Sequence, residues 1–140
     1  MVKEIVKDVN VLQQKSEEFI FGEDDHIIDD LIDTANAHRD NCAGLAAVQI
    51  GYHKRAFVVW SKDRGGYIPF INPKITRRFG NIYKAVEGCL SVEGEHEVKR
   101  HKSVGIVATS SNGLVFARSY EGRMAQVIQH EYDHLNGVLI

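Results

Sequence analysis

The sequence predicts an α+β domain in which antiparallel β-sheets surround a C-terminal helix, with a second helix near the N-terminus. Three observations support this fold class. Apolar residues recur at three- and four-residue spacing near the two ends of the chain, within 25–39 and 124–135. Short runs rich in β-branched and aromatic residues fill the middle of the chain. Ser111-Asn112-Gly113 separates two of these runs, as expected for a turn between antiparallel strands.

Size and charge narrow the class of protein. The 140 residues suit one domain, 1–140, without repeats or linkers. A net charge of −2 and the lack of a nucleic-acid motif predict no nucleic-acid partner, and no apolar run is long enough to span a membrane. Residues 1–8 lack the core of a signal peptide, which predicts a cytoplasmic protein. Cys42 and Cys89 are too few for a disulfide framework.

The first helix is predicted over residues 25–39, where Asp24 or Asp25 can cap its start. Its apolar face comprises Ile27, Ile28, Leu31, Ile32 and Ala35. We expect the opposite face to be solvated; it comprises Asp29, Asp30 and Asp33. Small side chains then dominate residues 41–49, and they allow backbone to approach a ligand closely. A tightly packed turn explains the same composition equally well.

The middle of the chain is predicted to form short β-strands. The predicted segments are 56–60, 67–71, 75–79, 82–86, 104–109 and 114–119. We expect turns at Asp63-Arg64-Gly65-Gly66 and at Gly80-Asn81, where glycine interrupts the apolar pattern. Asn112-Gly113 accepts the positive φ angles of a tight hairpin turn, so the last two strands should pair directly.

The last helix carries the clearest chemical signal of the sequence. Its apolar positions include Met124 and Leu135, and Asn136-Gly137 follows as a stop signal. His130 and His134 form H-E-x-x-H with Glu131, and residues four apart on a helix can reach one metal ion. Glu131 is then placed to take a proton from a metal-bound water. An amphipathic helix that carries two surface histidines would show the same pattern.

A hydrolytic metal usually needs three protein ligands and one open position for water. Cys89 is the strongest candidate for the third ligand, because it ends a predicted strand beside glycine and a thiolate suits a borderline metal. The five remaining histidines lie in polar or charged contexts, where exposure to solvent is expected. Taken without the helix motif, Cys89 reads as a small buried apolar residue.

Three segments of the chain together resemble a known family. Cys42-Ala43-Gly44-Leu45-Ala46-Ala47-Val48-Gln49, Glu87-Gly88-Cys89-Leu90-Ser91 and His130-Glu131-Tyr132-Asp133-His134 are similar, in order and spacing, to the three signature motifs of peptide deformylases. The resemblance spans about residues 25 to 140. It implies a hydrolase that removes the N-formyl group from formyl-methionine at the start of nascent polypeptides, with a transient contact to the ribosome.

The resemblance also implies roles for individual residues. Cys89, His130 and His134 would bind one divalent metal, ferrous iron in most of the family, while zinc, nickel or cobalt could occupy the site in a purified sample. Metal-bound water or hydroxide would attack the formyl carbon, with Glu131 as general base and acid. The remaining assignments are oxyanion donors from Gln49 and the Leu90 backbone, substrate contacts from Gly44 and Leu45, and supporting ionic contacts from Glu87, Arg100 and Asp133.

Three departures from the family pattern leave more than one function open. Cys42 replaces the first glycine of the first motif, and Val92-Glu93-Gly94 replaces the usual hydrophobic-Pro-Gly. The sequence also stops six residues after His134. We therefore consider a deformylase-like metal-binding protein with little turnover or with an altered N-blocked peptide substrate. The helix motif by itself is also compatible with a zinc endopeptidase, and the fold class with a metal-free α+β domain.

Overall fold

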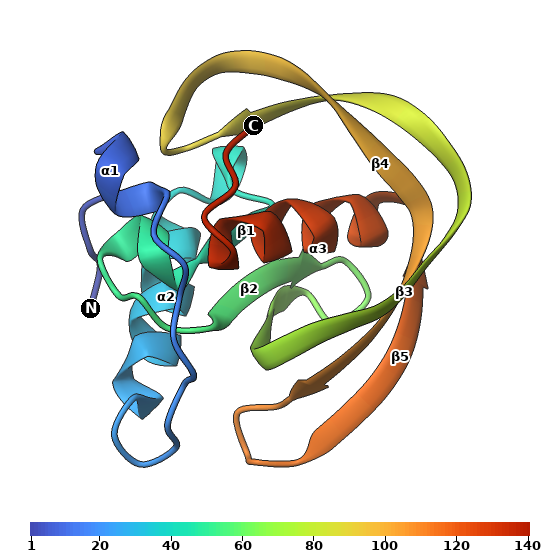
Figure 1. The fold of residues 1–140 in the computed structure, drawn as a ribbon. Coiled ribbons are helices and arrows are strands. Elements are labelled where there is room, and N and C mark those ends of the chain that lie inside the picture. The colour runs from blue at the N-terminus through green and yellow to red at the C-terminus, as the bar shows by residue number, and fades with distance from the viewer.

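The computed structural model describes residues 1–140 as an α+β fold whose sheet curls around the last helix (Figure 1). The elements in chain order are α1 (Val9–Leu12), α2 (Asp25–Ala37), η1 (Arg39–Asn41), β1 (Gly44–Ala46), η2 (Ala47–Ile50), β2 (Ala56–Ser61), β3 (Gly66–Cys89), β4 (Val92–Thr109), β5 (Val115–Glu121) and α3 (Gly122–Leu135). No helix combines the length and apolar character needed to cross a membrane. The predicted fold class and both predicted helices are confirmed.

All five strands belong to one antiparallel sheet in the order β1-β2-β3-β4-β5. The prediction of separate strands at 67–71, 75–79 and 82–86 was wrong, because β3 runs through all three. Irregularities in its pairing with β4 replace the expected breaks, and one of them lies at Gly80-Asn81. Gly80 takes a φ of +76° there, so this glycine permits a bulge within the strand and does not form a turn. β4 correspondingly begins at Val92, well before the predicted start at 104.

The hairpin predicted between β4 and β5 is confirmed, but its turn differs from the expectation. Ser110 and Gly113 close the turn, since the Gly113 N–H donates to the Ser110 carbonyl at 2.9 Å. Gly113 has a φ of +84°, whereas Asn112 does not take a positive φ. Asn112 instead accepts a hydrogen bond from the Leu114 N–H through its side chain, at 3.3 Å. The Asn-Gly pair therefore predicted the turn correctly, but Asn112 acts through its side chain and not through a positive φ.

Helix α2 has the predicted apolar face, but one acidic residue of its opposite face is not solvated. Asp30 is buried, and one of its carboxylate oxygens accepts a hydrogen bond from the Tyr52 hydroxyl at 2.8 Å. Asp24 also differs from the prediction, because its side chain makes no cap hydrogen bond to the helix. It accepts from the Ile20 N–H at 2.7 Å and so fixes the preceding loop.

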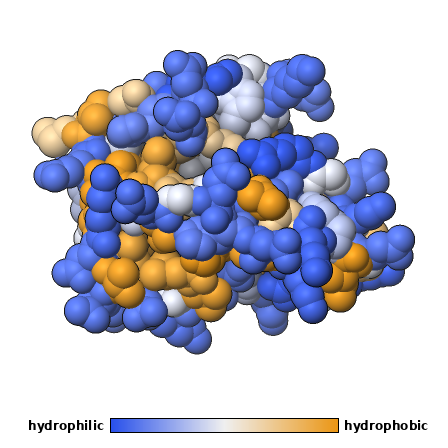
Figure 2. All heavy atoms as spheres, turned by 90° about the horizontal axis from the view of Figure 1, so that it is seen from above, coloured by the Kyte–Doolittle hydropathy of each residue, from blue (hydrophilic) through white to orange (hydrophobic).

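The sheet separates two apolar clusters, and this separation positions the site. Phe57 and Val59 of β2 face the cluster that includes Ile128 and Leu135 of α3. The alternate residue Val58 faces the cluster that includes α2. Seen from above, apolar side chains gather mainly over the half of the molecule that carries α1 and α2, and hydrophilic side chains border them (Figure 2). Helix α3 is thus held against one face of the sheet along most of its length.

The stop signal after α3 generates a stability prediction. Gly137 has a φ of +74°, and a Cβ there would lie 2.2 Å from the carbonyl oxygen of Gln13. Gly113 also has a positive φ, but nothing lies within 4 Å of its added Cβ. We expect Gly113→Ala to cost about 1–2 kcal/mol from backbone strain alone, and Gly137→Ala to cost distinctly more. Urea unfolding measures both changes. Equal losses would contradict the predicted clash with the Gln13 backbone.

Candidate metal centre

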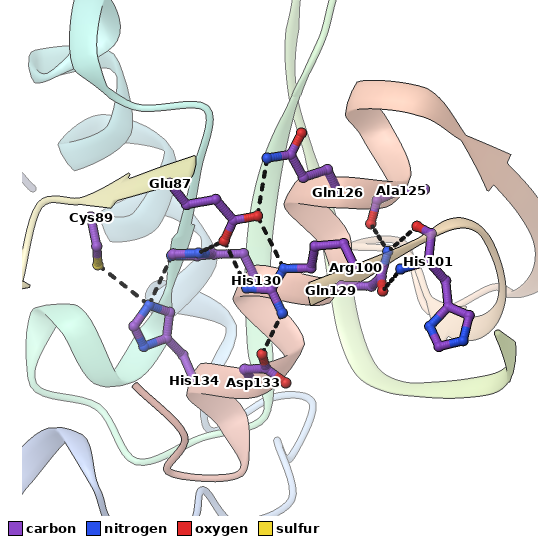
Figure 3. A network of polar contacts seen from close by, with 10 residues as sticks. All are labelled: Glu87, Cys89, Arg100, His101, Ala125, Gln126, Gln129, His130, Asp133 and His134. Atoms are coloured by element: carbon purple, nitrogen blue, oxygen red, sulfur yellow. Dashed lines mark hydrogen bonds and ion pairs between the residues drawn. The ribbon is translucent and has the colours of Figure 1, made fainter. Parts of the chain in front are cut away.

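Two elements far apart in the sequence bring a thiol and two imidazoles together. Cys89 is the last residue of β3, while His130 and His134 lie one turn apart on α3. The Cys89 Sγ lies 3.4 Å from the His134 Nε2, which lies 3.2 Å from the His130 Nε2. Figure 3 shows the thiol and the His134 ring turned toward each other. One ligand atom from each residue lies within 4.8 Å of the others.

These distances fit a single tetrahedral metal ion. Metal–nitrogen and metal–sulfur bonds of roughly 2.0–2.3 Å place tetrahedral ligand atoms about 3.3–3.6 Å apart. Burial lowers the pKa of His134 to about 3, so its imidazole is neutral and offers a lone pair. Burial also opposes charge on His130, but hydrogen bonds with Cys89 and Glu87 outweigh it and raise the pKa of His130 to about 10. The site therefore attracts positive charge, which a divalent cation can supply.

The orientation of His130 is fixed by a carboxylate behind it. The Nδ1 of His130 lies 2.9 Å from the Oε1 of Glu87, so this nitrogen donates to the carboxylate. The Nε2 would be the ligand atom, with a bound cation taking the place of its proton. His134 has no comparable partner, because its Nδ1 is buried without a hydrogen bond. The two ligand histidines thus differ in how firmly the protein holds them.

Glu87 belongs to a buried ionic cluster with Arg100 and Asp133 (Figure 3). The Arg100 guanidinium donates to both Glu87 oxygens, at 2.7 and 3.0 Å, and to Asp133 at 2.7 Å. Burial alone would raise the pKa of Glu87, but the hydrogen bonds from His130 and Arg100 hold it down at about 2. The three predicted supporting residues are therefore brought together, with Glu87 in contact with a ligand.

Glu131 follows the ligand His130 on α3, and its side chain is buried. Its Oε1 makes no hydrogen bond with the protein, and burial raises the pKa of Glu131 to about 7. A Cβ on Gly44 would lie 2.9 Å from the Glu131 Oε2 and 2.8 Å from the Val127 Cγ1. Gly44 is therefore needed as glycine so that β1 can pass directly against this carboxyl group. A carboxyl group that titrates near neutrality suits proton transfer.

Of the two predicted oxyanion donors, Gln49 faces the thiol and Leu90 is the next residue after it. The Gln49 Nε2 lies 3.4 Å from the Cys89 Sγ and 3.2 Å from the Ser91 Oγ. The orientation of this amide is fixed, because its Oε1 accepts from the Ala46 N–H at 2.9 Å. Leu90 follows Cys89 in the two-residue turn between β3 and β4, and its backbone N–H makes no hydrogen bond within the protein.

A cavity of about 1190 Å³ opens over these groups. Its lining includes Gly44, Gln49, Leu90, His130 and Glu131, together with Glu93 at its mouth. The side chain of Leu45 does not line it, because Leu45 is fully buried in the cluster on the α2 side of the sheet. Contact between Leu45 and a ligand in this cavity is therefore restricted to the backbone.

Cys42 is accommodated without joining the ligand set. Its Sγ donates to the Gly44 carbonyl at 3.2 Å, and its own carbonyl accepts from the Tyr67 hydroxyl at 2.6 Å. Burial raises the pKa of Cys42 to about 12, so the thiol stays protonated near neutral pH. A neutral thiol is a poor metal ligand and a poor nucleophile. Cys89 is thus the one cysteine among the clustered ligand atoms.

Sequence reasoning missed three polar residues around the site. Ser91 accepts from Gln49, and Gln126 donates to Glu87 at 3.0 Å. Gln129 donates to the His101 carbonyl at 2.8 Å and accepts from the His101 N–H at 3.0 Å, which ties α3 to β4. Gln126 precedes His130 by four residues, so helical spacing could have placed it on the same face.

A thiolate and two helix histidines around one metal position, with a buried carboxyl group alongside, define a metal-dependent hydrolase. Residues 2–140 match the family model for polypeptide deformylase. A peptide deformylase from Clostridium beijerinckii is 40% identical over 140 residues, all of both chains. The chain therefore belongs to the polypeptide deformylase family, which confirms the resemblance predicted from the sequence. It is a hydrolase that removes N-formyl groups from peptides, with Cys89, His130 and His134 as its metal site.

Solved structures agree with this assignment. The crystal structure of a peptide deformylase from Legionella pneumophila superposes with a TM-score of 0.90 at 33% identity, covering 99% of this chain and 83% of that one. A class I type b peptide deformylase from Acinetobacter baumannii, crystallised with Met-Ala-Ser, gives a TM-score of 0.87 at 25% identity. The coverage there is 99% of this chain and 96% of that protein's chain.

The ionic cluster generates a prediction on pH. The folded-state pKa of Glu87, about 2, lies below its ordinary value of 4.5. The ionised carboxylate therefore stabilises the fold above pH 4.5, and this contribution is lost as the pH falls toward 2. We expect Glu87→Gln to remove part of this pH dependence and to be less stable at neutral pH, because Arg100 loses its buried counter-charge.

The measurement is urea unfolding of metal-free protein across that pH window. The chelated sample removes the separate effect of pH on metal binding. An unchanged slope of unfolding free energy against pH in Glu87→Gln would contradict the assignment of the stabilisation to Glu87.

Proposed function

We propose that this deformylase acts on formyl-methionine at the N-terminus of nascent polypeptides, with Glu131 transferring the proton and ferrous iron as the metal. The observation that carries the proposal is the convergence of Cys89, His130 and His134 beside the unpartnered oxygen of Glu131. The peptide bound in the Acinetobacter baumannii structure, Met-Ala-Ser, has the composition expected of a product once its formyl group has been removed. Formyl-Met-Ala-Ser is accordingly the substrate for the tests below.

Glu131 performs the proton transfers in this mechanism. A bound metal supplies a Lewis acid that lowers the pKa of water and polarises the formyl carbonyl. Glu131 accepts the proton of the attacking water and later donates it to the departing amine, because its pKa near 7 allows both states at neutral pH. Its burial against Gly44 keeps the carboxyl group in one place between the two transfers.

Gln49 and Leu90 stabilise the negative charge that develops on the formyl oxygen. The Gln49 Nε2 already points at the Cys89 sulfur, and the Ala46 N–H fixes the amide through its Oε1, so little reorganisation is needed. The Leu90 N–H has no partner within the protein and offers a second donor. Removing one such donor elsewhere costs about 3–4 kcal/mol of transition-state stabilisation.

The peptide is oriented by the backbone around Gly44. β1 pairs with β2 on one side only, so no strand covers its opposite edge and an extended peptide can lie there. The Gly44 carbonyl and the Ala46 N–H already have side-chain partners in Cys42 and Gln49, so the peptide uses the remaining backbone groups. The backbone of Gly44 receives the formamide, and the backbone of Leu45 continues the contact. A peptide held in this way presents its formyl carbon toward Glu131 and the ligand cluster.

Cellular context follows from the substrate and from the chemistry of Cys89. Formylated N-termini arise during translation, which places the reaction in the cytoplasm with a transient contact at the ribosome. A reducing compartment also keeps Cys89 as a free cysteine, available as a metal ligand. A second candidate is a protein of this fold with an altered N-blocked peptide preference, favoured by the charge of Glu93 at the cavity mouth.

The role of Glu131 is tested by Glu131→Ala. We expect the variant to keep its metal, because Glu131 is not among the clustered ligands, and to release formate from formyl-Met-Ala-Ser roughly 10²–10⁴-fold more slowly. Elemental analysis and a formate assay measure the two properties on one sample. Glu93→Ala is the matched control, with little change expected at the chemical step. Near-normal turnover by Glu131→Ala would refute the proton-transfer role.

Metal identity is tested by loading the metal-free protein anaerobically with Fe²⁺, Zn²⁺, Ni²⁺ or Co²⁺. One thiolate and two imidazoles suit all four ions, so all should bind, and we expect the iron form to be the most active. The anaerobic iron form should lose activity on exposure to air. Higher activity of the zinc form would overturn the choice of iron, and absence of formate release with every ion would favour the second candidate.

A further inference from the structure

Gln126 lies on the same face of α3 as the ligand His130, one helical turn earlier. Its Nε2 donates to the Oε2 of Glu87 at 3.0 Å, while the His130 Nδ1 lies 2.9 Å from the Oε1 of the same carboxylate. Figure 3 shows the two side chains reaching the Glu87 carboxylate from α3. One helix therefore holds both oxygens of the group that orients a metal ligand.

The Glu87 carboxylate has two partners on each oxygen. Arg100 supplies the second partner in both cases, through its Nη2 at 2.7 Å and its Nε at 3.0 Å. Without Gln126, the Oε2 is held by Arg100 alone and the carboxylate is freer to turn away from His130. Of the two partners of the Oε2, Gln126 lines the cavity, whereas Arg100 is buried and does not line it.

We propose that Gln126 is a positioning residue for His130 and acts through Glu87. This inference rests on the proposed function, in which Cys89, His130 and His134 hold the metal. The donor end of the Gln126 amide is committed to Glu87, and its Oε1 makes no hydrogen bond within the protein. A peptide in the cavity can contact that free carbonyl, so the same side chain connects the bound substrate with the orientation of a ligand.

Gln129 provides a contrast on the same helix. Its amide bonds to the backbone of His101 and Ala125, and its side chain makes no hydrogen bond to Glu87 or to a ligand side chain. It contributes to the attachment of α3 to β4. A loss of Gln129 should therefore lower the stability of the fold and leave metal affinity unchanged. A loss of Gln126 should lower metal affinity and leave the stability of the fold largely unchanged.

The test replaces Gln126 by methionine, which keeps an unbranched side chain with similar helix propensity but has no donor. We expect the Kd for Co²⁺, measured by competition with a chelator, to rise roughly 10–100-fold, the usual effect of losing a contact behind a ligand. The absorption spectrum of the Co²⁺-loaded protein should change as well. Turnover of formyl-Met-Ala-Ser should fall mainly in kcat. The matched variant Gln129→Met should lower the Tm and leave the Kd and the spectrum unchanged.

A double-mutant cycle shows whether Gln126 acts through Glu87. In the Glu87→Gln background, we expect Gln126→Met to change the Kd by less than about two-fold, because the group that it positions is already lost. Equal changes in both backgrounds would overturn the proposal, as would an unchanged Kd and spectrum in the single variant. Gln126→Ala repeats the measurement if Gln126→Met does not fold.

The failure of this inference is distinguishable from failure of the proposed function. If the proposed function is wrong, the unaltered protein will not bind the metal with its three ligands or will not release formate. If only the role of Gln126 is wrong, the unaltered protein will bind the metal and release formate. The Gln126→Met variant will then bind Co²⁺ as tightly as the unaltered protein.

Discussion

The buried contact of Glu87 with Arg100 and His130 is the constraint on which the rest of the site depends. It joins three elements, because Glu87 lies on β3, Arg100 on β4 and His130 on α3. Buried ion pairs contribute little to stability on average, since desolvation offsets their attraction. The main contribution of this cluster is to position the elements. Because both oxygens of Glu87 are hydrogen-bonded, β3, β4 and α3 are fixed relative to one another.

The periodicities of strand and helix convert that constraint into a ligand set. Cys89 follows Glu87 by two residues on β3, and side chains two apart on a strand lie on the same face. His134 follows His130 by four residues and lies on the same helix face. Once the contact between Glu87 and His130 is made, the Cys89 thiol and the His134 imidazole are brought close to each other. Local geometry therefore places the remaining two ligands.

The sequence predicted the chemistry of the site better than the course of the chain. Spacing within H-E-x-x-H is a local property of one helix, so His130 and His134 were placed directly, and Cys89 followed from its motif. The continuity of β3 was missed because a glycine in a bulge and a glycine in a turn look alike in sequence; Gly80 is the example. The burial of Asp30 depends on the distant Tyr52 hydroxyl, which no local pattern reveals. Gln126 was missed because a polar residue on a helix is usually solvated.

The two edges of the sheet differ in a way that limits aggregation. A free strand edge is a template for any extended chain, and unfolded or partly folded copies compete for it with a substrate. β1 exposes such an edge but is only three residues long, Gly44–Ala46, which is too short to support stable stacking of another molecule. The opposite edge, β5, is longer and carries charged Arg118 and Glu121. Neither edge is therefore a good seed for fibrils, one because it is short and the other because it is charged.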